Sequence, residues 1–153
     1  MINEPIKDGN EDQLAVAIEA LKPKTLDDII RKNRDKLQLR VANEIEIQDL
    51  HSDLDASNQK EIFEDWSLIA FVTKDKTYLR LIGEARSCKK TKMTSIILKT
   101  DMRQKVVSTL SGSMYQLGTP NEGEPDLNQR IFICSFLHDV WLGPSFGVPE
   151  FFF

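Results

Sequence analysis

An oxygen-rich run at residues 53–64 has the spacing of a calcium-binding loop. Side-chain oxygens occupy loop positions 1, 3, 5, 9 and 12, where an EF-hand places its ligands. These residues are Asp53, Asp55, Ser57, Glu61 and Glu64. Asn58 stands where this loop needs glycine, and Lys60 where an apolar residue is usual, so the first three residues can instead be interpreted as helix caps. We expect no cofactor and no metal, and calcium remains the alternative.

Residues that could act as nucleophiles or bases do not form a recognisable catalytic set. His138 and Asp139 are neighbours, but adjacent helical positions point about 100° apart, so spacing alone does not pair them. Cys88 has cationic neighbours, which favour a reactive thiolate. Cys134 falls on an apolar helical face and is expected in the core. We therefore expect a protein that is not an enzyme, and a small hydrolase is the third hypothesis.

The main electrostatic feature is a basic segment at residues 86–105, in a chain whose net charge is −4. Its only anion is Asp101, and its cations are Arg86, Lys89, Lys90, Lys92, Lys99, Arg103 and Lys105. Such a segment can contact phosphates, although it has no aromatic residues for base stacking. A nucleic-acid-contacting accessory protein is therefore the alternative function. The other interpretation is a solvated turn, or an internal complement to the acidic N-terminal half.

Residues 1–60 are predicted to form an acidic, helical N-terminal region. Leu14, Ile18 and Leu21 recur at helical spacing and share one face. The proline in Lys22-Pro23-Lys24 ends that helix.

A second helix is predicted over residues 26–36, after Thr25 as a cap. Residues 37–50 fit either a strand or a helix and are left open. If the aromatic tail proves purely structural, we expect a protein partner to contact the acidic helices at Asp27, Asp28 and Arg31.

Residues 61–153 are predicted to form an α+β domain. Over about 66–118, apolar runs alternate with polar turns, which indicates an antiparallel β-meander of four or five strands. One face of this sheet is expected to be buried and the other wet. A short helix is expected before it, up to Asp65, and a C-terminal helix from the cap Asp126 to just before Gly143.

The chain ends in an aromatic tail, GPSFGVPEFFF. Val148 and some of the three final phenylalanines are expected to fill the remaining apolar face of the sheet. In an extended tail, Phe152 points away from Phe151 and Phe153. We therefore predict that this end is divided between core packing and partner binding.

A spaced pattern of small and polar residues runs through 94–118. It consists of Thr94-Ser95, Asp101, Val107, Thr109, Ser111-Gly112-Ser113, Tyr115 and Leu117-Gly118. The pattern resembles a hairpin of short uncharacterised bacterial and mobile-element proteins. The resemblance implies a β-hairpin and an accessory-gene origin, and it implies no activity.

Together these features predict a non-catalytic protein-binding module, such as an inhibitor, an immunity-type protein or an accessory protein in a bacterial or phage setting. The acidic N-terminus lacks the features of a signal peptide, and no apolar run is long enough to cross a membrane. We therefore expect a cytoplasmic protein that does not associate with membranes.

Overall fold

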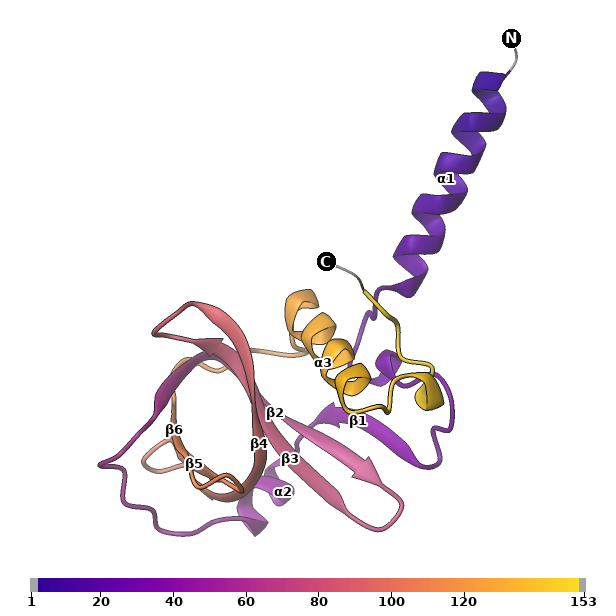
Figure 1. The fold of residues 1–153 in the computed structure, drawn as a ribbon. Helices are drawn as coiled ribbons and strands as arrows, with labels where there is room; N and C mark the ends of the chain where they lie inside the picture. The colour runs from indigo at the N-terminus through magenta and orange to yellow at the C-terminus, as the bar shows by residue number, and fades with distance from the viewer. Residues whose placement is uncertain (1–2, 152–153) are drawn as a thin grey trace.

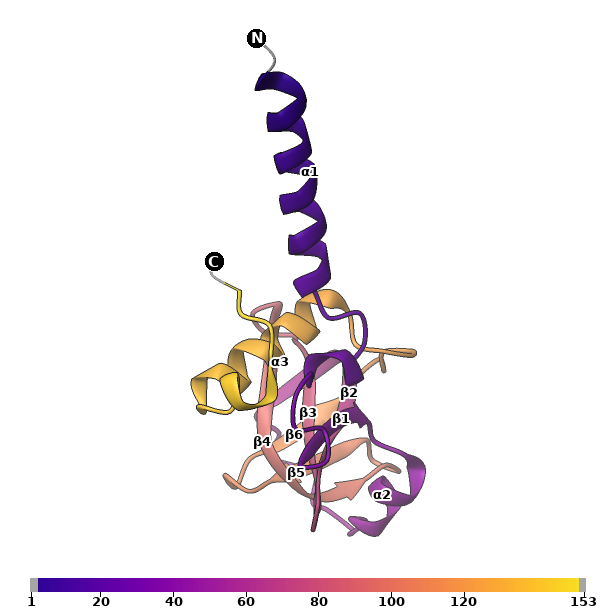
Figure 2. The same ribbon diagram turned by 90° about the vertical axis from the view of Figure 1, so that its right-hand side faces the viewer.

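The computed structural model describes residues 3–151, and of residues 3–11 only the helical backbone. A long helix, α1 (Asn3–Leu21), extends away from the rest of the chain, in which a small β-barrel is flanked by a second long helix (Figures 1 and 2). The predicted α+β class is confirmed. Among the described residues, no helix is both long enough and apolar enough to span a bilayer.

Six strands form one sheet in sequence order. They are β1 (Leu37–Val41), β2 (Glu61–Thr73), β3 (Thr77–Ala85), β4 (Lys90–Asp101), β5 (Val106–Thr109) and β6 (Met114–Leu117). All neighbouring pairs are antiparallel, which confirms the predicted meander, and β6 also pairs with the start of β2 in parallel. In a meander of five strands the first and last run in the same direction, so this closure into a barrel has to be parallel.

The elements before the barrel differ from their predictions. The helix predicted over 26–36 is wrong, because only one 3-10 turn forms, η1 (Asp27–Ile29). The chain after it is held as a loop, in which Asn33 adopts a left-handed backbone and Arg34 donates to the carbonyl oxygens of Asp27 and Ile30. The short helix expected up to Asp65 is also wrong, since β2 begins at Glu61.

The undecided residues 37–50 contain both kinds of element. Strand β1 pairs with the far half of β2, from Leu37 opposite Thr73 to Val41 opposite Ile69. Helix α2 (Glu44–Asp49) follows and begins with a capping box made by Asn43 and Glu46. The segment left open between strand and helix therefore supplies one strand to the sheet and one short helix.

Strand β2 separates two apolar cores. Ile69 and Phe71 face a first cluster that includes Ile133 and Leu137. The alternate residues of β2, with β3, β4, β5 and β6, fill the barrel interior as a second cluster. The expectation of one wet face is therefore wrong here, because β2 is buried on both sides, as its uninterrupted apolar run allows.

The first core is covered by α3 (Leu127–Asp139), which begins at the predicted cap: Asp126 accepts a hydrogen bond of 2.9 Å from the backbone N–H of Gln129. The predicted end just before Gly143 is wrong, because the helix stops at Asp139 and Trp141 takes a left-handed backbone. After α3 the chain turns through η2 (Pro144–Phe146) and returns along the helix, where Val148 is buried in the first core as expected. Helix α3 therefore lies between the sheet and the returning tail.

Candidate functional site

One wall of a groove is built by the strand register. Residues directly opposite each other on paired strands share a face. Phe71 lies opposite Tyr78, and Arg80 opposite Ile96. Leu37 and Thr73 form the next pair along the same face. These six side chains therefore gather on the outer face of the sheet, where the β2–β3 hairpin extends beyond the barrel.

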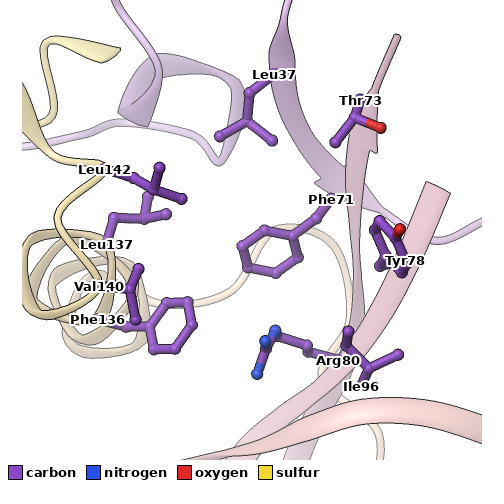
Figure 3. Close-up of a pocket in the computed structure, with 10 residues that line it drawn as sticks. All are labelled: Leu37, Phe71, Thr73, Tyr78, Arg80, Ile96, Phe136, Leu137, Val140 and Leu142. Atoms are coloured by element: carbon purple, nitrogen blue, oxygen red, sulfur yellow. The ribbon is translucent and has the colours of Figure 1, made fainter. Parts of the chain in front are cut away.

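The other wall is the C-terminal end of α3 and the turn after it. Phe136, Leu137, Val140 and Leu142 face the sheet residues across a cavity of about 250 Å³ (Figure 3). We call the site formed by these ten residues the Arg80 groove. A cavity of about 150 Å³ is enough to bind benzene, so the groove has room for an aromatic or branched aliphatic side chain.

Arg80 is the only charged residue of the groove. Its guanidinium lies 4.8 Å from the ring centre of Phe136 and 5.7 Å from that of Phe71, and Nη1 donates to the carbonyl oxygen of Thr94 at 3.0 Å. Among the described residues, no Asp or Glu forms an ion pair with it. Burial lowers the pKa of Arg80 from its usual value, but an arginine keeps its charge at neutral pH. Arg80 is therefore a cation held in an apolar site, with no counter-ion in the part of the chain whose side chains are described.

Trp141 stands beside the groove, between the lining residues Val140 and Leu142. Its φ of 66° places it in the left-handed region. The N–H groups of Leu142 and Gly143 both bond to the carbonyl oxygen of Leu137, so Trp141 occupies the position after a helix end that glycine usually takes. Its side chain is 88% exposed. A bulky aromatic residue in this conformation is a genuine outlier, and such outliers concentrate at functional sites.

Comparison of the chain with protein-family models, with curated proteins and with solved structures finds no match in any of the three. The function must therefore be argued from the site.

The basic segment does not form one patch. Arg86, Lys89, Lys90 and Lys92 lie at the β3–β4 end of β4, whereas Lys99, Arg103 and Lys105 lie toward its other end. Lys90 and Lys99 are separated by roughly 30 Å along the strand. Arg86 forms an ion pair with Glu64, which supports the interpretation of this residue as an internal complement.

The calcium-binding arrangement is not assembled. Glu64 lies in β2, where it binds Arg86 and accepts a 2.8 Å hydrogen bond from the N–H of Thr119. Asp53 is exposed, and Asp55 accepts from the N–H of Ser57 within a turn. Within residues 12–151, whose side chains are described, no three His, Cys, Asp or Glu residues are grouped to hold a metal ion. This geometry therefore does not support calcium binding at residues 53–64.

The acidic residues proposed as a second partner contact bind neighbouring cations. Asp28 pairs with Arg31 at 3.2 Å, and Asp27 pairs with Arg34 at 2.5 Å. Arg31 also donates to the carbonyl oxygens of Ala20 and Leu21 at the end of α1. These contacts fix the chain that connects α1 to the first core.

The aromatic tail is described as far as Phe151, which is half-buried against the first core. This position agrees with core packing for one of the three phenylalanines. Phe152 and Phe153 lie outside the described residues, so their division between core and partner stays a prediction.

Residues of the spaced pattern form hydrogen bonds within the barrel. Ser95 Oγ lies 3.1 Å from Ser111 Oγ, which lies 3.1 Å from Thr109 Oγ1. A Cβ atom on Gly118 would lie 2.3 Å from Glu64 Oε1, so glycine is required there unless the glutamate moves. The expected hairpin exists as β5 and β6.

Asp101 of the same pattern connects the β4–β5 turn to the loop before β2. Its carboxylate accepts from the N–H of Leu54 at 3.1 Å and from the side chain of Gln104 at 2.7 Å. The bond from Leu54 is the main reason why the pKa of Asp101 falls to about 2.

The cysteines and the histidine considered for catalysis lie in the core, against the returning tail and in an exposed turn. Cys134 is buried in the first core, as predicted, and burial raises the pKa of its thiol to about 12. His138 lies 2.9 Å from the carbonyl oxygen of Val148, which helps to hold the returning tail. Cys88 is exposed in the β3–β4 turn.

Sequence reasoning missed Arg80 and Trp141. One signal was available: Arg80 has the same parity as Tyr78 and Ile82 in β3, so it interrupts an apolar alternation with a charge. The signal for Trp141 was weaker, because a tryptophan just before Leu142-Gly143 also fits the apolar face of a helix. Its exposure depends on α3 ending at Asp139.

Proposed function

We propose that this protein is a non-catalytic protein-binding module that holds an apolar, acidic segment of a partner in the Arg80 groove. The observation that carries the proposal is Arg80 itself, a half-buried cation with no carboxylate partner among the described residues, placed over two aromatic rings. An arginine in this setting is suited to a carboxylate, because its planar fork can donate two parallel hydrogen bonds.

The partner segment needs two groups close together. An aromatic or branched apolar side chain would fill the cavity between Phe71, Phe136 and Leu142. A carboxylate beside it would reach the N–H groups of Arg80 that Thr94 does not use. Removal of water by the apolar walls would strengthen this ion pair.

A protein segment fits this site better than a free small molecule. The lining residues Val140 and Leu142 are themselves exposed, and the exposed Trp141 lies between them in the chain, so the rim of the groove offers apolar surface to a larger partner. Tryptophan and arginine are the residue types that most often dominate interface energies. An inhibitor, an immunity-type protein or an accessory protein in a bacterial or phage setting would use such a surface.

The experiment is selection of peptides from a displayed random library on the full-length protein. We expect enriched sequences in which Asp or Glu adjoins an aromatic or branched residue. Their affinity should fall at least about 30-fold, the loss typical of a hot-spot residue, for Arg80→Gln and for Trp141→Ala. Leu110→Ala is the matched control, because Leu110 is an exposed apolar residue on the barrel, after β5. Peptides that bind wild type and Arg80→Gln equally would overturn the proposal.

A further inference from the structure

Helix α1 has an apolar stripe that the described chain leaves uncovered. Leu14, Ile18 and Leu21 recur at positions i, i+4 and i+7, so they share one face. All three are exposed, as is every described side chain from Asp12 to Leu21. Figures 1 and 2 show the helix pointing away from the barrel and α3. A single helix of this length, with Pro5 and Gly9 in it, is marginal in water without packing.

The charge of α1 complements the groove. Residues 3–21 carry five acidic side chains and one basic side chain, Lys7. Pairing of two α1 helices would bring like charges together, which is unfavourable. The Arg80 groove offers an apolar lining and a cation that no described residue pairs with, which matches an acidic helix with an apolar stripe.

The base of α1 and the groove lie at opposite ends of α3. Arg130, in the first turn of α3, donates to the carbonyl oxygen of Pro23 at 2.8 Å, which fixes the chain just after α1. Leu137, Val140 and Leu142 of the groove belong to the other end. In this arrangement α1 points away from its own groove and is free to reach that of another molecule.

We propose that the segment entering the Arg80 groove is α1 of a second copy of this chain. Each helix of the pair lies in the groove of the other molecule, so the same contact occurs twice around a two-fold axis. The stripe Leu14, Ile18 and Leu21 packs on the groove and on Trp141. Glu11, three positions before Leu14 and seven before Ile18, falls on the same helical face and supplies the counter-ion for Arg80, whereas Glu19 is paired with Lys22. This inference rests on the proposed function, because it uses the same groove.

The test is sedimentation velocity of the full chain from about 1 to 100 µM, the range that brackets micromolar affinity. The wild type should pass from monomer to dimer. Arg80→Gln and Ile18→Lys should each raise the dimer Kd by about 30-fold or more. Val16→Lys is the matched control, because Val16 is a β-branched residue that is 69% exposed, against 47% for Ile18, and lies on the opposite side of α1, so its replacement should leave the Kd unchanged. Circular dichroism melting of each variant checks that the fold is kept.

A mixing experiment identifies the contact. Arg80→Gln keeps its helix and Ile18→Lys keeps its groove, so a mixture of the two should form a heterodimer through one intact contact, detected by energy transfer between labelled chains. A wild type that stays monomeric overturns the inference. A dimer that Ile18→Lys breaks and Arg80→Gln does not would also overturn it, since the helices would then pair with each other.

Peptide binding by Ile18→Lys separates this inference from the proposed function. If selected peptides bind this variant through Arg80 while the wild type is monomeric, the groove has another partner and only the second copy is wrong. If no peptide binds and no dimer forms, both proposals fail.

Discussion

Replacement of Trp141 by glycine should stabilise the fold and abolish partner binding. The left-handed backbone costs a residue with a Cβ atom roughly 1–2 kcal/mol. Glycine avoids this cost but loses more backbone entropy on folding, about 0.5–1 kcal/mol. Because the indole is 88% exposed, its removal sacrifices little buried area. The net expectation for Trp141→Gly is a gain of about 0.5–1 kcal/mol in the free energy of unfolding.

The measurement is urea unfolding followed by the fluorescence of Trp66. Trp66 is half-buried at the barrel, where its indole N–H donates to the carbonyl oxygen of Gly118 at 3.0 Å. The chain has two tryptophans, so in the Trp141 variants Trp66 is the only one left. The gain should appear as a higher midpoint with an unchanged slope.

Trp141→Ala is the matched control, because alanine removes the indole and keeps the strain. The free energy of unfolding of the glycine variant should exceed that of the alanine variant by about 1 kcal/mol, which is the difference expected where the backbone needs a positive φ. Both variants should lose partner binding equally. The reasoning is refuted if Trp141→Gly is less stable than wild type by more than about 1 kcal/mol, since the indole would then be a packing residue.

Four further changes test the rest of the fold. Ile133→Ala removes three buried carbon atoms, so urea unfolding should show a loss of about 2–5 kcal/mol; an unchanged Trp66 midpoint would mean that α3 and the barrel unfold separately. Asp126→Ala removes the cap of α3 and should cost about 1 kcal/mol in thermal melts, and no change would place helix initiation elsewhere. The folded-state pKa of Asp101, about 2, lies below its usual value, so its stabilisation is present above about pH 4 and is lost as pH falls towards 2. Asp101→Asn should therefore reduce the acid sensitivity of the melting temperature, and an identical pH profile would contradict this. Phe151→Ala should cost about 1 kcal/mol in melts because the ring is half-buried, whereas no loss would remove it from the core.

The parts of the fold that were predicted correctly depend on local signals. Asp126 caps α3 because a short acceptor side chain precedes an apolar helical pattern. The meander follows from apolar runs separated by polar turns. Both rules need only neighbouring residues, so a single sequence was enough to apply them.

The parts that were missed depend on partners distant in the chain. The apolar run in β2 is compatible with burial on one face or two, and only the packing of α3 on its outer face decides this. The helix predicted at 26–36 does not form, and the side chain of Arg34 instead donates hydrogen bonds to the carbonyl oxygens of Asp27 and Ile30. The parallel pairing of β2 with β6 joins residues more than fifty positions apart.

The candidate site was missed for the same reason. Partner contacts were predicted at charged residues and phenylalanines because these stand out in the sequence. In the structure, Arg86 is paired with Glu64 and Asp28 with Arg31. The groove exists because Arg80 shares a face with Phe71 and because α3 ends opposite them. The strand register places Arg80 on the same face as Phe71, and the length of α3 decides where it ends. Residue types alone predict neither the register nor the helix length.

Three features of the described residues depart from ordinary folding rules and bear on the proposed contact. Trp141 takes a position that suits glycine, Arg80 has no described counter-ion, and the apolar stripe that contains Ile18 is exposed. Elsewhere Arg86, Arg31 and Arg34 find carboxylates within the chain. Packing of the described chain alone gives no reason for the left-handed Trp141, the unpaired Arg80 or the exposed stripe. One event, the docking of an acidic helix against the groove, would neutralise Arg80, cover the stripe and bury the indole together.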